Sequence, residues 1–547
     1  MTPSTASPAT GIAPKTETLR APRQSSARGQ ADATGLLGAL HGADEDGWLE
    51  CAQALVLRGD HEMALLVLDH AMAAHPRSTR IRLALGGSLL HHGNEPAAET
   101  VLRALLCDVP EHAACSLLLA GMLKEQGRMK AAATTVVDTF ARKRQDVESL
   151  LLAIELLDDA GHQQEAATLC EAEIAAGSGD ARLFAHAGML LSQLGKFEQA
   201  RVYQESALAM TAQALDWHVP LGMAGLQRYR QPDHPDLSLF AGYLQQSGLG
   251  SWARAGLLFA LGKARDDLGD YAQAAALLRE ANALVNAMTR WPRKQWRRSI
   301  EARLKRKPPA GRLVSPMDWI PVFIVGLPRA GTTLLAELLG RHPAVRHRGE
   351  LPWMPTLADQ LATAGDRDDG ALERAAGAYA AQLRQDDGGA GWLIDKQPHN
   401  FMHVDLILAM FPNARIIHCQ RNARDNALSL WMQSFQAGKQ GFAYDFTDIA
   451  AVIHGSRRLM QHWRLRYPDS IRAVRYEALI ADPASVLDAL CTWLTLPFHN
   501  LVDAHPEDGA ISTASLWQAR QPIHSGSIQR WKHYAVLLPE LLSLPDI

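Results

Sequence analysis

The sequence of 547 residues has few cysteines, and nothing in their spacing pairs them. The six cysteines follow neither disulfide nor metal-ligand spacing: Cys51, Cys107, Cys115, Cys170, Cys419 and Cys491. They are therefore predicted to be reduced core residues, as in a cytoplasmic protein. His342, His347, His399 and His418 lack ligand spacing as well, so no metal site is expected.

Long apolar runs and an excess of charge of one sign are also missing. No run approaches the roughly 18 to 20 apolar residues that span a bilayer, and the N-terminus has no secretory pattern. The net charge of −3 carries no signature of polyanion binding, which disfavours nucleic acid as a partner. Residues 1–35 contain almost no large apolar side chains and are predicted to be a disordered tail. The length of the chain requires more than one core.

A repeat of 34 residues begins near residue 45. Five glycines recur at this interval: Gly59, Gly93, Gly127, Gly161 and Gly195. An alanine follows each glycine after five residues, giving Ala64, Ala98, Ala132, Ala166 and Ala200. Each unit is predicted to be two short amphipathic helices, with the glycine in the turn and the alanine where the helices approach closely. The pattern resembles the tetratricopeptide repeat in its period and its small-residue positions.

The repeat continues with one irregularity. After residue 214 the register slips, and Gly269 with Ala274 restores one more unit. Residues 36–290 are therefore predicted to form an all-α solenoid of about six units, the last one atypical. Such a solenoid either acts as a scaffold or holds a peptide in its concave face, and both roles stay open. Residues 291–317 are basic and are predicted to be a linker.

A short strand, a glycine loop and a helix follow the linker. Val322 to Val325 is an apolar, β-branched run, and Leu334 to Leu339 has helical spacing. Gly326 and Gly331, between them, have the spacing of a P-loop, whose N–H groups bind an anion. The P-loop of nucleoside triphosphatases continues with Lys-Ser/Thr, whereas Thr332 and Thr333 follow here, and Arg329 supplies a cation from within the loop.

Three further strands are predicted in the second domain, residues 318–547. They end in Lys396, Arg421 and Tyr476, and helices alternate with them. This order predicts an α/β domain with a P-loop-like parallel sheet and flanking helices. Ligands of such sheets bind at the carboxyl ends of the strands, which is where these residues fall.

The motifs of this domain, taken in order, resemble the signatures of the sulfotransferases. They are Pro328-Arg-Ala-Gly-Thr-Thr333, Arg421 with Ser429 eight residues later, and Arg475-Tyr-Glu477. The resemblance is to the tyrosylprotein branch and its bacterial tetratricopeptide-linked relatives. It implies 3′-phosphoadenosine 5′-phosphosulfate (PAPS) as co-substrate. The 5′ end of the donor would be bound by Arg329, Ala330, Gly331, Thr332 and Thr333, and the 3′-phosphate by Arg421, Ser429 and Tyr476.

The resemblance also implies the catalytic groups. Glu350 would be the general base, and Lys396 would stabilise charge on the bridging oxygen. Ser515, or in second place Ser525 or Ser527, would add a hydroxyl, and Arg530 would lie near the co-substrate. The sequence departs from the tyrosylprotein pattern in Glu350-Leu351, where that branch has two glutamates, and in Gln433, where it has an arginine.

The predicted function is transfer of a sulfuryl group to an acceptor hydroxyl, with protein tyrosine as one candidate beside sugars, lipids and small phenols. A P-loop kinase-like phosphotransferase and a non-catalytic interaction scaffold are the alternatives. The structural alternatives are an ion pair with Asp425 for Arg421 and an ion pair with Asp395 or a nearby carboxylate for Lys396. The oligomeric state stays open.

Overall fold

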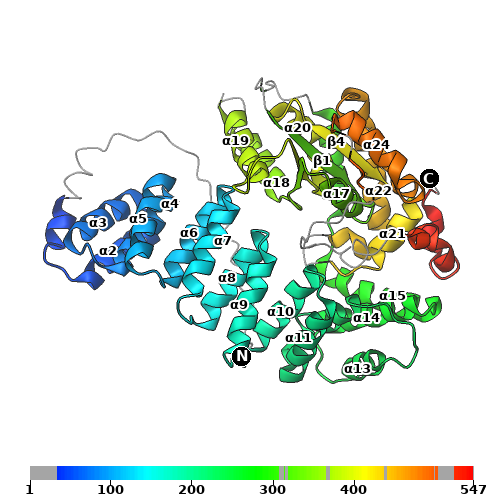
Figure 1. Ribbon diagram of the computed structural model, residues 1–547, viewed down its shortest axis with the longest axis horizontal. Coiled ribbons are helices and arrows are strands. Elements are labelled where there is room, and N and C mark those ends of the chain that lie inside the picture. Colours follow the sequence, from blue (N-terminus) through cyan, green and yellow to red (C-terminus); the bar gives the residue numbers. More distant parts are fainter. Residues whose placement is uncertain are drawn as a thin grey trace. The chain divides into compact units, whose positions relative to one another are not determined.

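The structure is a computed structural model that describes residues 34–306, 313, 318–364, 370–435, 440–497, 499–502 and 523–545 (Figure 1). The chain divides into two compact units, residues 1–109 and 110–547, and each is described by itself. None of the helices within the described ranges is long and apolar enough to cross a membrane.

The first unit contains two helix pairs. They are α2 (Glu45–Leu57) with α3 (His61–Ala74), and α4 (Thr79–His91) with α5 (Glu95–Asp108). Each helix begins at a residue whose side chain accepts a hydrogen bond from a backbone N–H of the first turn: Asp44, Asp60, Ser78 and Asn94. These caps satisfy N–H groups that have no partner within the helix, and so fix where each helix starts.

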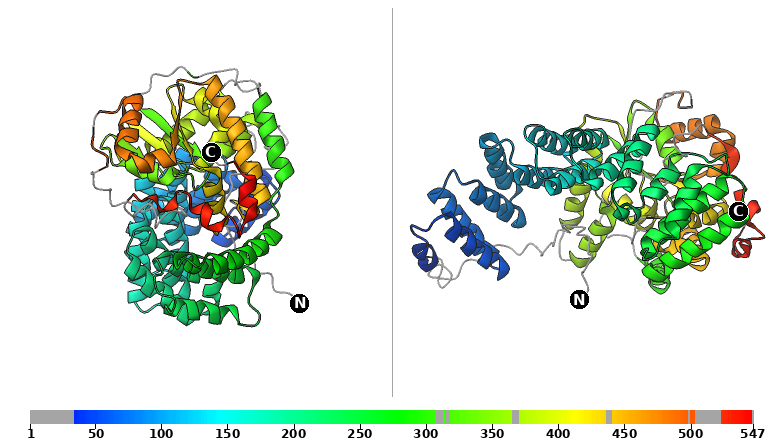
Figure 2. Two further views of the ribbon diagram at one scale, coloured as in Figure 1. Left: turned by 90° about the vertical axis from the view of Figure 1, so that its right-hand side faces the viewer. Right: turned by 90° about the horizontal axis from the view of Figure 1, so that it is seen from below.

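The second unit continues with further helix pairs, shown from two more sides in Figure 2. Three regular pairs come first: α6 (Ala113–Glu125) with α7 (Met129–Phe140), α8 (Val147–Asp159) with α9 (Gln163–Ala175), and α10 (Ala181–Gln193) with α11 (Phe197–Met210). An irregular part follows, with η1 (Ala212–Leu215), α12 (Val219–Gly225) and α13 (Pro235–Leu244). The last pair is longer than the others, α14 (Ser251–Asp267) with α15 (Tyr271–Thr289).

The predicted roles of the repeated glycines and alanines are confirmed. All six turn glycines have φ between 72° and 83°, a left-handed conformation that a side chain disfavours. All six alanines are fully buried. At the alanines, a larger side chain would collide with the partner helix. The 34-residue pattern therefore marks the turn and the close contact of each helix pair.

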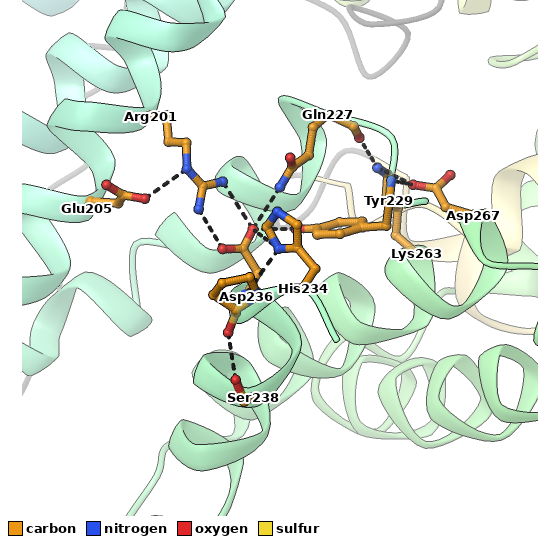
Figure 3. Close-up of polar contacts among 10 residues, drawn as sticks. Arg201, Glu205, Gln227, Tyr229, His234, Asp236, Ser238, Lys263 and Asp267 are labelled. Atoms are coloured by element: carbon orange, nitrogen blue, oxygen red, sulfur yellow. Dashed lines mark hydrogen bonds and ion pairs between the residues drawn. The ribbon is translucent and has the colours of Figure 1, made fainter. Parts of the chain in front are cut away.

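The slip in the repeat coincides with a buried polar network around Asp236 (Figure 3). The side chain of Asp236 is 2% exposed and pairs with Arg201, at 2.6 Å. It also accepts hydrogen bonds from Gln227 at 2.9 Å and from the Tyr229 hydroxyl at 2.7 Å. Because every oxygen is satisfied, the network serves to close the irregular segment onto α11.

The basic segment carries a helix, α16 (Arg293–Lys305), which packs on α22 (Phe446–Arg466). Ile300 is buried in this contact, and the Trp296 indole N–H donates to the carbonyl oxygen of Ala451 at 3.3 Å. A methyl group at Gly455 would lie 2.9 Å from the Trp296 nitrogen. Arg297 and Arg298 are exposed, whereas Arg293 pairs with Asp448 and Arg303 donates to the carbonyl oxygen of Met402 at 2.8 Å.

The second domain is built on five parallel strands in the order β2-β3-β1-β4-β5. The strands are β1 (Ile320–Gly326), β2 (Val345–His347), β3 (Trp392–Asp395), β4 (Arg415–Gln420) and β5 (Ile471–Arg475). The predicted α/β fold is confirmed with one strand more than expected. The edge strand β2 has three residues, too few to show a pattern of its own.

Helices cover both faces of this sheet. Val322 and Ile324 of β1 belong to a core with α17 (Thr332–Gly340), α23 (Tyr476–Ala481) and α24 (Pro483–Leu494). Phe323 and Val325 point to the other face, toward α18 (Trp353–Ala364), α19 (Ala371–Arg384), α20 (Val404–Met410) and α22. A strand buried on both faces is continuously apolar, as the sequence of β1 is.

The repeat helices of residues 110–547 share a core with the sheet domain. Residues of α14 and α15 pack in one cluster with α21 (Ala423–Trp431), η4 (Gly441–Tyr444), α22 and the C-terminal turns η6 (Arg530–Tyr534) and η7 (Pro539–Ser543). A second contact joins α7 to the turn that follows α19. There the Asp386 carboxylate accepts from the N–H groups of Lys130 and Ala131, at 2.7 and 2.8 Å.

Candidate active site

The loop between β1 and α17 has a backbone that only small residues allow at two positions. Gly326 has φ of 152°, and a methyl group there would lie 2.6 Å from the carbonyl oxygen of Cys419. Gly331 has φ of 92°, and a methyl group there would lie 2.6 Å from the ring of Tyr476. Arg329 is left-handed as well, with φ of 67°. Left-handed residues in such a loop turn successive N–H groups toward one side, where an anion can bind.

Helix α17 begins at the end of this loop, and no side chain caps its first turn. The N–H groups of that turn carry the positive end of the helix dipole. Ala330, Thr332 and Thr333 are buried beside them. The loop and the helix start therefore form one anion-binding surface.

Residues that follow the neighbouring strand β4 hydrogen-bond to this loop. Asn426 donates to the carbonyl oxygen of Pro328 at 2.9 Å, and Arg421 donates to that of Arg329 at 2.8 Å. The Nε of Arg329 donates in turn to the Ser429 hydroxyl at 3.1 Å. Arg329 was expected with the 5′ end of the donor, but its side chain lies with Arg421 and Ser429.

The two arginines form a cationic cluster. Burial, together with the charges of Arg421 and Arg530, lowers the pKa of Arg329 to about 10. Burial also lowers the pKa of Arg421, whose guanidinium lies 4.7 Å from the Tyr476 ring centre. The Nε of Arg421 is buried without a hydrogen-bond partner in the described part of the chain. Buried cations held close together favour an anionic ligand, because it offsets their repulsion.

An ion pair with Asp425 was the alternative expected for Arg421, but the Asp425 carboxylate binds other groups. Its two oxygens accept from the backbone N–H groups of Gln529 and Trp531, at 2.7 and 2.9 Å. The second nitrogen of Arg421 donates to the carbonyl oxygen of Ser527 at 2.8 Å. Arg421 and Asp425 thus bind the C-terminal segment, residues 523–545, beside the loop.

Glu350 and Lys396 meet on the other side of the loop. Their side chains form an ion pair in which Lys396 is 1% exposed and Glu350 is 42% exposed. Asp395 is not the partner of Lys396. Its buried carboxylate accepts from Leu351 N–H at 3.2 Å, from Asn400 at 2.6 Å and from the Tyr379 hydroxyl. Burial raises the pKa of Asp395 to about 7.

His399 lies near this pair, and sequence reasoning gave it no role. Its Nε2 donates to the side-chain oxygen of Gln440 at 2.9 Å, which leaves the lone pair on Nδ1. Burial lowers the pKa of His399, while the Glu350 charge acts in the opposite direction. The imidazole is therefore neutral at neutral pH. The only hint of a role for His399 in the sequence was its position three residues after Lys396.

Comparison with known proteins points to one family. Residues 321–500 match the model of the sulfotransferase family. A relative from Aquifex aeolicus (strain VF5), itself named only "Uncharacterized protein", is 30% identical over 399 residues, covering 66% of this chain and 51% of its own. "Protein-tyrosine sulfotransferase 1" of Danio rerio is 26% identical over 233 residues, covering 38% of this chain and 65% of its own.

The similarity to the sulfotransferase family thus falls on the sheet domain. The chain spans about half the length of the Aquifex relative and 65% of that of the Danio relative. Among solved structures, the sulfotransferase domain of the Synechococcus PCC 7002 olefin synthase is 22% identical, with 41% of this chain and 90% of that chain covered. Its TM-score of 0.31 is too low to carry an argument.

The remaining predicted residues of the sulfotransferase domain lie around the C-terminal segment. Ser525 and Ser527 belong to η5 (Ser525–Ser527), beside Arg421, whereas Ser515 lies outside the described residues. The charge of Arg530 lowers the pKa of Arg329, and Arg530 forms an ion pair with Asp266 of α14. No group of three or more metal-ligating side chains occurs within the described ranges.

Proposed function

We propose that the protein is a sulfotransferase that uses PAPS and transfers its sulfuryl group to an acceptor hydroxyl. We assign residues 36–290 to the solenoid, 291–317 to the linker and 318–547 to the transferase domain, after a tail of residues 1–35. The observation that carries the proposal is the interlocked set Arg329, Arg421 and Ser429 beside the uncapped start of α17.

A PAPS molecule carries anionic groups at both ends of its ribose, so it needs two anion sites. The N–H groups of the loop with Thr332 and Thr333 suit the 5′ group. Arg421, stacked on Tyr476, suits the 3′-phosphate together with Ser429 and Arg329. The buried Nε of Arg421, which has no partner among the described residues, is a donor that this phosphate would satisfy.

The ion pair of Glu350 and Lys396 supplies the reacting groups in this proposal. Glu350 accepts the proton of the acceptor hydroxyl, since its carboxylate is half exposed and open to an acceptor. The freed oxygen bonds to sulfur while the bond from sulfur to the bridging oxygen breaks. Lys396 then stabilises the negative charge left on the bridging oxygen. The products are the sulfate ester, the bisphosphate anion and a protonated Glu350, which releases its proton to water before the next turnover.

We propose a tyrosine in a polypeptide as the acceptor to test first. The support is the likeness to a protein-tyrosine sulfotransferase of Danio rerio and the repeat helices next to the transferase domain. Such a solenoid offers an extended surface that can hold a peptide.

The test is a transfer assay with purified full-length protein and ³⁵S-labelled PAPS. Tyrosine-containing peptides, an aryl alcohol and a sugar are offered in parallel, and labelled product is identified by mass spectrometry. Label transferred to a hydroxyl supports the proposal. Phosphate transfer from ATP with Mg²⁺, without sulfuryl transfer, would favour the kinase-like alternative instead.

A further inference from the structure

The C-terminal segment reaches the proposed donor site from the last repeat of the solenoid. Its turn η6 contacts both α15 of that repeat and α21 of the sulfotransferase domain (Figure 1). The backbone of the segment is fixed on the domain side by Asp425, through the N–H groups of Gln529 and Trp531. This leaves the side chain of Arg530 between the two parts.

Asp266, near the end of α14, is the residue of the repeat that meets Arg530. Its side chain is 8% exposed and forms an ion pair with the Arg530 guanidinium. Its other oxygen accepts from the Tyr534 hydroxyl at 2.7 Å. The carboxylate is therefore held on both oxygens by neighbouring residues of one turn, which fixes its position as well as its charge.

Arg530 in turn belongs electrostatically to the donor site. It lies three residues after Ser527, whose carbonyl oxygen accepts from Arg421 at 2.8 Å, and its charge lowers the pKa of both Arg329 and Arg421. Without a restraint, an arginine side chain would move away from two others of the same charge. Asp266 provides that restraint from the repeat.

We propose that Asp266 is a positioning residue for donor binding: through its contacts with Arg530 and Tyr534, the last repeat completes the anion site of the sulfotransferase domain. The proposal rests on the proposed use of PAPS. It makes the last repeat a working part of the transferase, in addition to any role in holding a peptide.

The direction in which Asp266→Asn changes the affinity for an anionic nucleotide separates a positioning role from a purely electrostatic one. Asp266→Asn removes a negative charge near an anion site. If Asp266 were only a nearby charge, the variant would bind an anionic nucleotide more tightly. If Asp266 holds Arg530 in place, the variant binds it more weakly, because the guanidinium is free to turn away.

A matched control lies at the same interface. Arg279 of α15 pairs with Glu540 of the C-terminal segment at 2.8 Å, and both side chains are well exposed. Arg279→Gln therefore loosens the same contact between repeat and segment without touching the cluster of Arg329, Arg421 and Arg530. Any effect of general loosening appears in both variants.

The experiment measures binding of adenosine 3′,5′-bisphosphate by calorimetry to the full-length protein and its variants. We expect Asp266→Asn to raise Kd about tenfold, as loss of a charged hydrogen-bond partner does. We expect Asp266→Glu to restore most of the affinity, and Arg279→Gln to leave Kd within about twofold. In the transfer assay, the effect should fall on the donor KM more than on kcat.

An unchanged or lower Kd for Asp266→Asn would overturn the inference. Should that variant not fold, Tyr534→Phe removes only the hydroxyl that fixes Asp266, and a Kd that does not rise in this variant would overturn it equally. A wild-type protein that binds no bisphosphate would instead contradict the proposed function, so the two failures can be told apart.

Discussion

Lys396 is almost fully buried and pairs with the half-exposed Glu350. A buried ammonium group needs a partner, and Glu350 supplies it while staying partly accessible to solvent. The Lys396 ammonium group thus lies inside the protein, whereas the Glu350 carboxylate lies partly at the surface. The different exposure of the two residues is consistent with the two different tasks proposed for them.

The variant Glu350→Gln tests the base directly. It keeps the size of the side chain and a hydrogen-bond acceptor for Lys396, but the amide cannot take a proton. We expect the transfer rate to fall by about 10² to 10⁴ while the affinity for adenosine 3′,5′-bisphosphate is retained. The rate is measured with labelled donor at saturating acceptor.

His399 provides the matched control for that experiment. The variant His399→Asn removes the neutral imidazole and its free Nδ1 while leaving Glu350 and Lys396 in place. A small effect of His399→Asn beside a large effect of Glu350→Gln agrees with the proposed base. The reverse order would transfer the role of base to His399.

Asp395 should make the stability of the protein depend on pH. Burial raises its pKa to about 7, from an ordinary value near 3.8. The folded state therefore binds this proton more tightly than the unfolded state, and the stabilisation is present in acid and lost as pH rises through about 7.

Asp395→Asn cannot ionise and should lack this dependence. Between pH 5 and pH 7, wild type should lose roughly 1.4 kcal/mol per pH unit relative to the variant. Urea unfolding at several pH values measures the difference. Parallel curves for the two proteins would show that Asp395 does not keep its proton in the folded state.

At the scale of single elements, the loop from Gly326 to Gly331 and the Asp236 network show two uses of polar groups. In the loop, the N–H groups at the start of α17 have no side-chain cap, and Arg329 and Arg421 hydrogen-bond to neighbouring residues. Around Asp236, every polar partner is used within the protein, so the network holds the irregular segment of the solenoid together.

Asp236→Ala should therefore destabilise the protein without a direct effect on chemistry. The change leaves Arg201, which is 25% exposed, without its buried partner. We expect a loss of about 3 kcal/mol in the free energy of unfolding. The control Glu280→Ala breaks the exposed pair with Arg254 and should cost less than about 1 kcal/mol. Equal losses in denaturant unfolding would contradict this account of the network.

Elements that follow a local rule could be predicted from the sequence. The glycine and alanine pattern predicted the helix pairs because each turn and each close contact involves residues a few positions apart. The strand β2 was not predicted, since its three residues pair with β3 only through the sheet. Helix α21 begins at Ala423, because the Asn422 side chain caps its first turn.

The candidate site was predictable to the extent that its motifs are local. Arg329, Arg421 and Ser429 were named from the sequence, and they lie together. Asp266 was not named, because its contact with Arg530 joins residues 264 positions apart with no pattern between them. The use of Asp425 as a backbone clamp was missed for the same reason.

At the scale of the compact unit 110–547, the repeat helices and the sheet domain share one apolar core. Ala255, Leu258 and Phe259 of α14 belong to the same buried cluster as Trp431 of α21 and Tyr534 of η6. Removing the repeat helices would expose this apolar surface to water. We therefore expect that α14 and α15 cannot be separated from the sheet domain by a cut in the basic linker.

Two fragments test this statement. A fragment of residues 110–547 keeps the shared core and should unfold in a single transition and bind adenosine 3′,5′-bisphosphate. A fragment of residues 318–547 lacks α14, α15 and α16 and should be insoluble or lose binding. Differential scanning calorimetry and binding measurements check both. Full binding by the shorter fragment would show that the repeats are not needed for the site.

The central claim is that two anion sites lie at the carboxyl edge of the sheet, one at the start of α17 and one at Arg421. Calorimetry with adenosine 3′,5′-bisphosphate and adenosine 5′-phosphate tests it most directly. We predict that the bisphosphate binds at least about tenfold more tightly, and that Arg421→Ala removes this advantage. Equal affinities for the two nucleotides, or no heat of binding at millimolar concentration, would contradict the claim.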